Sequence, residues 1–280
     1  MKQADRAGPG GRYLGIDFSG GAAAWRERVR KPSVWIATAE ITAEGPALVS
    51  LVPVQDLPGA GGCFNRLVSL LSRGDYIAAA IDAPFSLPSA HVPQGGHGAL
   101  VDLVGALPDA DDRSFPRGAA LMALAEGVQE KESLKPLRTS ENAWARQAVN
   151  TRSTLWNGPR GGAPFAVACL SLIARSGRPC WPWTRSGPGM LVEAFPAAQL
   201  RHWSLPHQRY AGEAGAETRN VIVAALKSRI ALSSKDADAM SASPDALDAV
   251  IAVFAAIAAP TLLGAYPPEA ELEGWIAVHP

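Results

Sequence analysis

Short apolar runs separated by glycine, proline and charged residues fill the start of the chain, a pattern typical of β-strands. The turn signal Glu44-Gly45 separates two of these runs, so we expect an antiparallel meander. Residues 62–74 instead place apolar side chains at helical spacing and end at a glycine. The pattern therefore predicts three strands, a helix and a fourth, buried strand, at Arg12–Gly20, Ser33–Thr42, Pro46–Val54, Gly62–Gly74 and Tyr76–Asp82.

The rest of the chain predicts mainly helices, with one further strand at Gly189–Ala197. The clearest helix signal is at Ser243–Ala259, where Ser243 is a good N-cap, Pro244 suits the first helical position and an apolar stripe follows. Residues 86–188 are rich in Pro, Gly, Arg and Trp, and we interpret them as a mostly helical insertion between the fourth and fifth strands. The other helices are expected at Ala119–Glu132, Glu141–Val149, Phe165–Arg175, Ala197–Trp203 and Asn220–Leu232.

Length and composition fit one domain at residues 12–280 behind a disordered tail at 1–11. Hydrophobic residues make up 48% of the 280 residues, enough for a substantial core. The run Ala249–Tyr266 is Ala-rich and interrupted by Pro260, which favours a buried helix over a membrane span. Three widely spaced cysteines form neither a disulfide framework nor a metal-ligand motif, and no signal peptide is apparent, so we expect a cytoplasmic protein.

Acidic residues recur where predicted elements end or begin. Asp17, Asp82 and Glu193 end strand-like runs, whereas Asp245 and Asp248 share one face at the start of the last helix. Because ligands of open α/β sheets gather at strand ends, we expect these carboxylates to converge. Each acid also has an ordinary local explanation, such as an Asx turn for Asp17 or a favourable helix dipole for Asp245. The combined pattern is more specific than any one of them.

Converging carboxylates repel one another unless a cation neutralises them. Mg²⁺ and Mn²⁺ prefer such oxygen ligands, and two ions together can promote the in-line displacement of a phosphodiester. The sequence contains no GxSxG, GxxxxGK[ST] or HExxH motif that would indicate a different chemistry. We therefore expect a two-ion site with Asp17, Asp82, Glu193 and Asp248 as metal ligands and Asp245 as a fifth catalytic acid.

The motifs "GIDFSG", "AIDAPFSLP", "EAFPAA" and "SPDALDAVIAVFAA" occur in this order, and together they resemble a family of unknown function that is predicted to contain RNase H-like nucleases. The resemblance covers about 13–89 and 189–259. It implies a mixed five-stranded sheet whose first three strands are antiparallel, with helices on both faces. It also implies that the family's acids correspond to Asp17, Asp82, Glu193, Asp245 and Asp248.

Two other functions stay open at this point. Actin-like ATPases and sugar kinases share the fold, and their phosphate loop resembles the Asp-x-Ser-Gly segment here, so Ser19, Gly20 and Gly21 would cradle a phosphate. Such kinases repeat the fold twice, whereas this chain contains one copy. A catalytically inactive nucleic-acid-binding module of the same fold is the other alternative.

The insertion supplies the candidate contacts to a nucleic acid. Between Arg113 and Arg185 eleven Lys and Arg residues face four Glu residues, although the whole chain is balanced at 26 basic and 26 acidic residues. Cations attract phosphates and indoles stack on bases, which makes Arg152, Trp156 and Arg160 the candidates for substrate binding. Arg138 and Glu141 are expected to face the acidic site. The sequence does not decide between DNA and RNA, or between a monomer and a homodimer.

Overall fold

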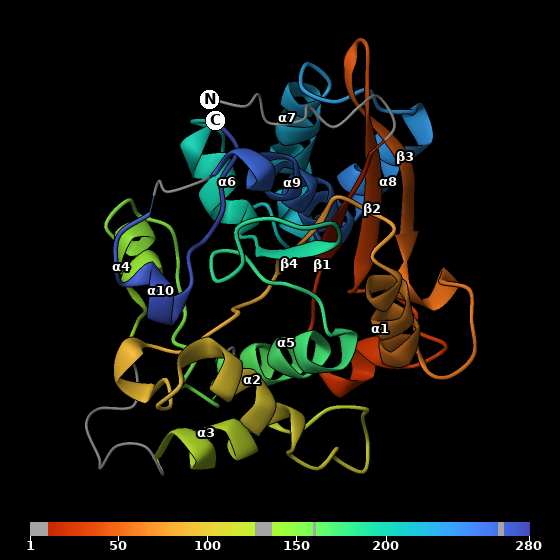
Figure 1. Cartoon of the computed structure of the whole chain (residues 1–280). Helices are drawn as coiled ribbons and strands as arrows, with labels where there is room; N and C mark the ends of the chain where they lie inside the picture. The colour runs from red at the N-terminus through yellow and green to blue at the C-terminus, as the bar shows by residue number, and fades with distance from the viewer. Residues whose placement is uncertain (1–10, 127–135, 159–160, 263–265) are drawn as a thin grey trace.

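A five-stranded mixed sheet organises the molecule, and the computed structural model describes it at residues 11–126, 136–158, 161–262 and 266–280. The strand order is β3-β2-β1-β4-β5; β1, β2 and β3 are antiparallel, whereas β1, β4 and β5 run parallel (Figure 1). This confirms the predicted fold class. The predicted tail lies outside the described residues except for Gly11. The strands are β1 (Arg12–Asp17), β2 (Trp35–Thr42), β3 (Gly45–Pro53), β4 (Ala78–Asp82) and β5 (Met190–Glu193).

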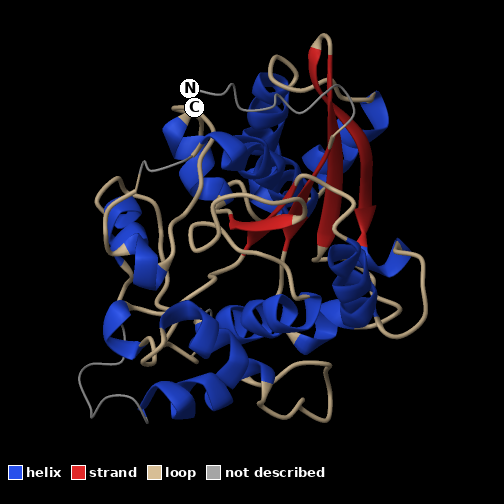
Figure 2. Ribbon diagram, in the orientation of Figure 1, coloured by secondary structure: helices blue, strands red, loops and turns tan. Residues whose placement is uncertain are grey.

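Both faces of the sheet are buried, and each packs against its own set of helices (Figure 2). Alternate side chains of β1 divide between the faces: Tyr13 lies with α9 (Pro244–Ala258), whereas Leu14 and Ile16 lie with α1 (Cys63–Arg73) and α5 (Ala163–Ser176). The faces of a strand alternate with a period of two, so Asp17 belongs to the α9 face. Burial on both sides explains why these strands read as continuous apolar runs.

The remaining helices extend the two layers. In Figure 1, α2, α3 and α5 lie together at the bottom of the view, and α6, α7 and α9 lie toward the top. α5 belongs to the segment between β4 and β5, yet it packs on the sheet, so this segment contributes to the main core. The other helices are α2 (Gly96–Gly105), α3 (Gly118–Glu126), α4 (Thr139–Ala145), α6 (Pro196–His202), α7 (Ala216–Leu226), α8 (Ser234–Ala242) and α10 (Ala270–Glu273).

The expected helices are present, with shifted ends, and three further helices are found. α7 begins earlier than the expected Asn220 and ends at Leu226, α4 ends at Ala145, and residues 127–135 of the expected Ala119–Glu132 helix lie outside the described residues. α2, α8 and α10 were not expected from the sequence. α8 has only Ala237 and Met240 buried, so its sequence carries little apolar periodicity. Its N-cap, Ser233, accepts a hydrogen bond from the backbone N–H of Asp236.

Helix α9 lies unusually close to the sheet. Its start follows the predicted signals, because the Ser243 side chain accepts a hydrogen bond from the N–H of Ala246 and Pro244 occupies the first turn. A Cβ placed on Gly15 of β1 would lie 2.1 Å from the carbonyl oxygen of Ala249 and 2.4 Å from the amide nitrogen of Val253. Pro244–Thr261 is long and apolar enough for a membrane span, but 67% of it is buried inside the protein, which identifies it as a core helix.

We predict that Gly15→Ala lowers the free energy of unfolding by at least about 2 kcal/mol, because the added methyl group forces backbone apart from backbone. Urea unfolding followed by circular dichroism measures this change. Gly98→Ala in α2 is the matched control: a Cβ there meets no atom within 4 Å. Removing a helical glycine should leave stability unchanged or raise it by up to about 1 kcal/mol. Equal stabilities of the two variants would contradict the proposed close contact.

Candidate functional site

The pairing of β1 with β4 brings the first two acids together. These strands are parallel, and their register places Asp17 opposite Asp82 at the carboxyl end of each strand. Residues paired across neighbouring strands point to the same face, so both carboxylates lie on the side of the sheet that α9 covers. The first and fourth strands are therefore neighbours, as predicted, and their terminal aspartates lie side by side.

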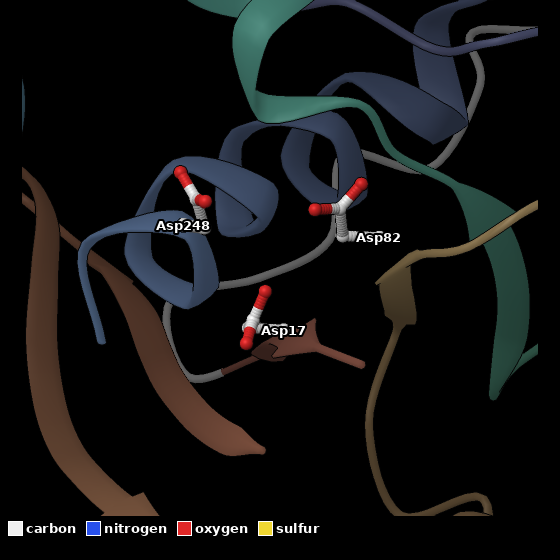
Figure 3. Close-up of side chains that lie close together, drawn as sticks. All are labelled: Asp17, Asp82 and Asp248. Atoms are coloured by element: carbon white, nitrogen blue, oxygen red, sulfur yellow. The ribbon is translucent and has the colours of Figure 1, made fainter. Parts of the chain in front are cut away.

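Asp248 completes a cluster of three carboxylates, which we call the aspartate cluster: Asp17, Asp82 and Asp248. One oxygen of each lies within 4.8 Å of one oxygen of the others. Figure 3 shows Asp248 on α9 facing the two strand-end aspartates. The first turns of α9 cross the ends of the strands because Gly15 admits the helix backbone one turn further on, at Ala249 and Val253.

Burial and mutual repulsion raise the pKa of every member of the aspartate cluster. Burial contributes most to the raised pKa of Asp17, followed by the charges of Asp248, Asp245 and Asp82. Burial likewise raises the pKa of Asp82 to about 7, the charge of Glu193 adds to it, and Arg152 opposes it. The pKa of Asp248 is raised by burial and by Asp82, although a hydrogen bond from Tyr210 lowers it. Three negative charges are therefore costly here without a cation.

Asp245 lies one helical turn before Asp248 but outside the aspartate cluster. Burial raises its own pKa, and its charge contributes to the raised pKa of all three clustered aspartates. It is thus a neighbouring acid, as its place in the sequence predicted. Its proposed catalytic role stays a prediction.

Glu193 ends β5 as expected, but its side chain belongs to the opposite face of the sheet. It pairs with Ile81 rather than with Asp82, and its neighbour Leu191 packs with the α1 and α5 face. Its carboxylate binds the Arg138 guanidinium through both oxygens, one at 2.7 Å, and accepts a hydrogen bond from the backbone N–H of Phe85. The structure therefore brings Glu193 beside the aspartate cluster, with its charge already paired.

Arg138 and Glu141 form the start of α4 and are both buried. The Nε–H of Arg138 donates to Glu141 at 2.9 Å, and its Nη1 also donates to the carbonyl oxygen of Glu273. Glu141 in turn accepts a hydrogen bond from the backbone N–H of Arg138, as the N3 glutamate of a capping box does. The guanidinium thus ties α4 to the end of β5. These contacts leave it with little capacity to bind a phosphate, the role that the sequence suggested.

The loop after β1 is packed rather than open. A Cβ on Gly20 would lie 2.3–2.5 Å from backbone atoms of Pro164 and Phe165 at the start of α5, so this glycine is needed for a close backbone approach. The Ser19 hydroxyl accepts a hydrogen bond from the N–H of Gly21 at 3.2 Å. Their proposed role in substrate binding stays a prediction, and packing explains Gly20 independently.

Fewer basic residues between Arg113 and Arg185 are available to contact a nucleic acid than the composition suggested. Arg113 and Arg117 pair with Asp112, and Arg175 pairs with Asp109, acids that lie just before the counted segment. Arg152 is exposed and close enough to Asp82 to lower the pKa of that carboxyl group. Trp156 is half-buried with its indole over Gly158. Arg160 lies outside the described residues.

A cavity of about 590 Å³ opens beside the aspartate cluster, and Asp82 and Asp248 form part of its wall. Tyr210 lies in the same wall, and its hydroxyl donates to Asp248 at 2.9 Å. The buried Arg219 holds the Tyr210 backbone by donating to its carbonyl oxygen at 2.6 Å. Sequence reasoning missed Tyr210, because an isolated tyrosine in a loop carries no motif that would connect it to Asp248.

The aspartate cluster fits a hard divalent cation. Carboxylate oxygens from two strands and a helix are within mutual reach, and none of the salt bridges among the described residues includes any of the three. Such ions prefer carboxylate ligands, and their positive charge offsets the mutual repulsion that helps to raise the pKa values of the three aspartates. Asp17, Asp82 and Asp248 are therefore the residues that would hold Mg²⁺ or Mn²⁺.

We predict that the metal-free protein loses stability as pH rises. A carboxyl group with a raised pKa binds more protons when folded than when unfolded, so its stabilising effect is present below the unfolded pKa and is lost through the folded pKa. For Asp82 this window extends from the ordinary value of 3.8 to about 7. The loss is on the order of 4 kcal/mol from this group alone. Urea unfolding in EDTA across this range measures it.

Asp248→Asn removes one of the repelling charges and should flatten this pH dependence. Excess Mg²⁺ or Mn²⁺ should restore the stability of the wild type at alkaline pH, but should do less for the variant. A metal-free protein whose stability is constant or rises over this range would contradict the electrostatic description of the cluster.

Comparison with known proteins places the chain in a family. A family model described as "Protein of unknown function (DUF429)" matches residues 31–271. The matched region contains Asp82, Glu193, Asp245 and Asp248, and it begins after Asp17. No curated protein and no solved structure matches the chain. Because the family model covers most of its length, the chain belongs to the DUF429 family.

Proposed function

We propose that this protein is a divalent-metal-dependent nuclease that hydrolyses phosphodiester bonds and has an RNase H-like fold. The observation that carries the proposal is the convergence of Asp17, Asp82 and Asp248, with one oxygen of each within 4.8 Å of the others, on the carboxyl ends of two parallel strands. Clustered, buried carboxylates without a paired cation are the arrangement that Mg²⁺ or Mn²⁺ catalysis requires.

The sheet supports the RNase H-like assignment. The resemblance implies a mixed five-stranded sheet whose first three strands are antiparallel, with helices on both faces, and the sheet β3-β2-β1-β4-β5 has this arrangement. Fold alone does not establish an activity, so the functional argument rests on the acids. The proposed setting is cytoplasmic, with DNA or RNA as the substrate.

Each residue of the site has a separate role in this proposal. Asp17, Asp82 and Asp248 hold the metal, which when bound activates water and stabilises charge on the phosphate. Tyr210 keeps the Asp248 carboxylate in place through its 2.9 Å hydrogen bond. Arg152 attracts the phosphate to the exposed side of Asp82. A second ion would take Asp245 as a protein ligand, because Arg138 already binds both oxygens of Glu193.

The structure favours this function over the phosphate-loop alternative. A kinase-like loop needs the backbone around Gly20 to be open to a phosphate, whereas here the Cα of Gly20 faces the backbone of α5. Under the nuclease proposal the tight packing of this loop holds in place the segment that follows Asp17.

The nuclease proposal predicts cleavage of a nucleic acid in Mn²⁺ or Mg²⁺ and none in EDTA. A panel of labelled single strands, duplexes, RNA–DNA hybrids and branched junctions tests it by gel electrophoresis. Asp17→Asn or Asp248→Asn should reduce the rate by about a hundredfold or more, because each removes a ligand charge that the reaction depends on.

Asp75→Asn is the matched control, since this aspartate is exposed and pairs with Arg73 just before β4 begins, at the far end of that strand from Asp82. It should cleave as fast as the wild type. Cleavage that persists in EDTA and in Asp17→Asn would contradict the proposal.

A further inference from the structure

The cavity beside the aspartate cluster has the dimensions of a binding pocket for a small molecule or for one unit of a polymer. Its volume of about 590 Å³ falls within the range of roughly 300–1,000 Å³ that small-ligand sites occupy. The wall combines strand ends, the segment before α5 and the loop that carries Tyr210. A double helix, whose major groove alone is about 12 Å wide, is too wide to enter it.

Two half-buried phenylalanines, Phe165 and Phe195, contribute apolar surface to this wall. Phe165 is the third residue of α5, yet it belongs to none of the hydrophobic clusters that the described residues form. Its ring is therefore not needed to fill the core. An aromatic ring beside a cavity next to phosphodiester chemistry offers a platform on which a base stacks.

The cavity also carries two exposed cations, Arg152 and Arg209. Arg209 has a φ of 59°, a left-handed conformation that is unfavourable for a residue with a side chain and that persists only where the surroundings enforce it. The loop is held on both sides: Gln208 donates to the carbonyl oxygen of Ala148 at 2.6 Å, and Arg219 donates to the carbonyl oxygens of Tyr210 and Gly212. The loop thus fixes Arg209 in the cavity wall.

His207 also lines the cavity. Its Nε2 has no hydrogen-bond partner among the described residues, but this atom is buried away from the cavity surface. The wall therefore combines an aromatic face and two cations, beside the acids that would hold the metal.

We propose that this cavity binds one unpaired nucleotide, so that the substrate of the nuclease proposed above is single-stranded nucleic acid or an unpaired strand end. The base stacks on Phe165, while Arg152 and Arg209 contact the phosphates. A nucleotide inside a duplex is stacked and paired, and it would have to leave the helix to reach this wall. The inference rests on the proposed nuclease function, because that function supplies the phosphodiester.

Binding measured without catalysis tests the inference. Fluorescence anisotropy in EDTA compares a short labelled single strand with a blunt duplex of the same sequence. The single strand should bind at least about tenfold more tightly. Phe165→Ala should weaken this binding by about 5- to 100-fold, the range that one stacked base contributes. Arg152→Ala should weaken it and lower the slope of log affinity against log salt by about one.

Two controls accompany these variants. Val49→Ala removes an apolar side chain that is 52% exposed on β3, and Arg73→Ala removes a cation at the far end of β4 from Asp82. Both should bind as the wild type does. Thermal unfolding of each variant establishes that it is folded, and Phe165→Leu replaces Phe165→Ala if the latter is not, because it keeps apolar volume and removes only the ring.

The outcomes separate this inference from the nuclease proposal. Single-strand binding that needs Phe165, without cleavage in any metal, supports the cavity and rejects the nuclease. Metal-dependent duplex cleavage that Phe165→Ala leaves unchanged supports the nuclease and overturns the cavity assignment. Equal binding of single strand and duplex also overturns it. Nucleoside monophosphates should compete with the single strand; if they bind while no oligonucleotide does, the cavity takes a free nucleotide and the single-strand assignment is wrong.

Discussion

The contact between Gly15 and the backbone of α9 is the constraint on which the site depends. With no side chain at Gly15, the carbonyl of Ala249 and the amide of Val253 approach β1 at distances that any Cβ would forbid. The helix therefore lies low over the sheet, and Asp248, the residue before Ala249, reaches the strand ends where the β1–β4 register has already paired Asp17 with Asp82. The sheet supplies two acids on one face and the helix supplies the third. A helix held one side-chain layer further away would separate Asp248 from the Asp17 and Asp82 pair.

The buried acids form two groups: glutamates that pair with an arginine, and aspartates that have no such partner among the described residues. Glu193 and Glu141 share the buried guanidinium of Arg138, which joins α4 to the end of β5 and neutralises charge that would otherwise be costly to bury. The aspartate cluster has no comparable partner among the described residues, and burial together with mutual repulsion raises the pKa of each member. Arg138 offsets part of the cost of burying its two glutamates, whereas the unpaired aspartates cost stability unless something binds. This contrast is the physical reason for assigning a ligand to one group and not to the other.

Much of this arrangement could be predicted from the sequence, and the failures have identifiable causes. The apolar runs and turn signals predicted the strands and the antiparallel meander, and the family resemblance implied the mixed sheet. The capping residues Ser243 and Pro244 predicted the start of α9. Glu193 was expected beside the aspartates, but its strand is apolar on both faces, so alternation could not reveal that it points away from them. Arg138 was expected to be near the acids, and only the tertiary structure shows that its guanidinium is already paired with two glutamates. Tyr210 and the cavity depend on loop packing, for which the sequence has no period or motif.

The central claim is that the three aspartates form one cation site, and diffraction from crystals grown with Mn²⁺ tests it most directly. Data collected at the manganese absorption edge locate the ion without any assumption about activity. The account predicts an anomalous peak between the carboxylates of Asp17, Asp82 and Asp248 in the wild type, and its loss in Asp248→Asn. A wild-type crystal with no peak among these side chains, or with manganese bound only elsewhere, would contradict it.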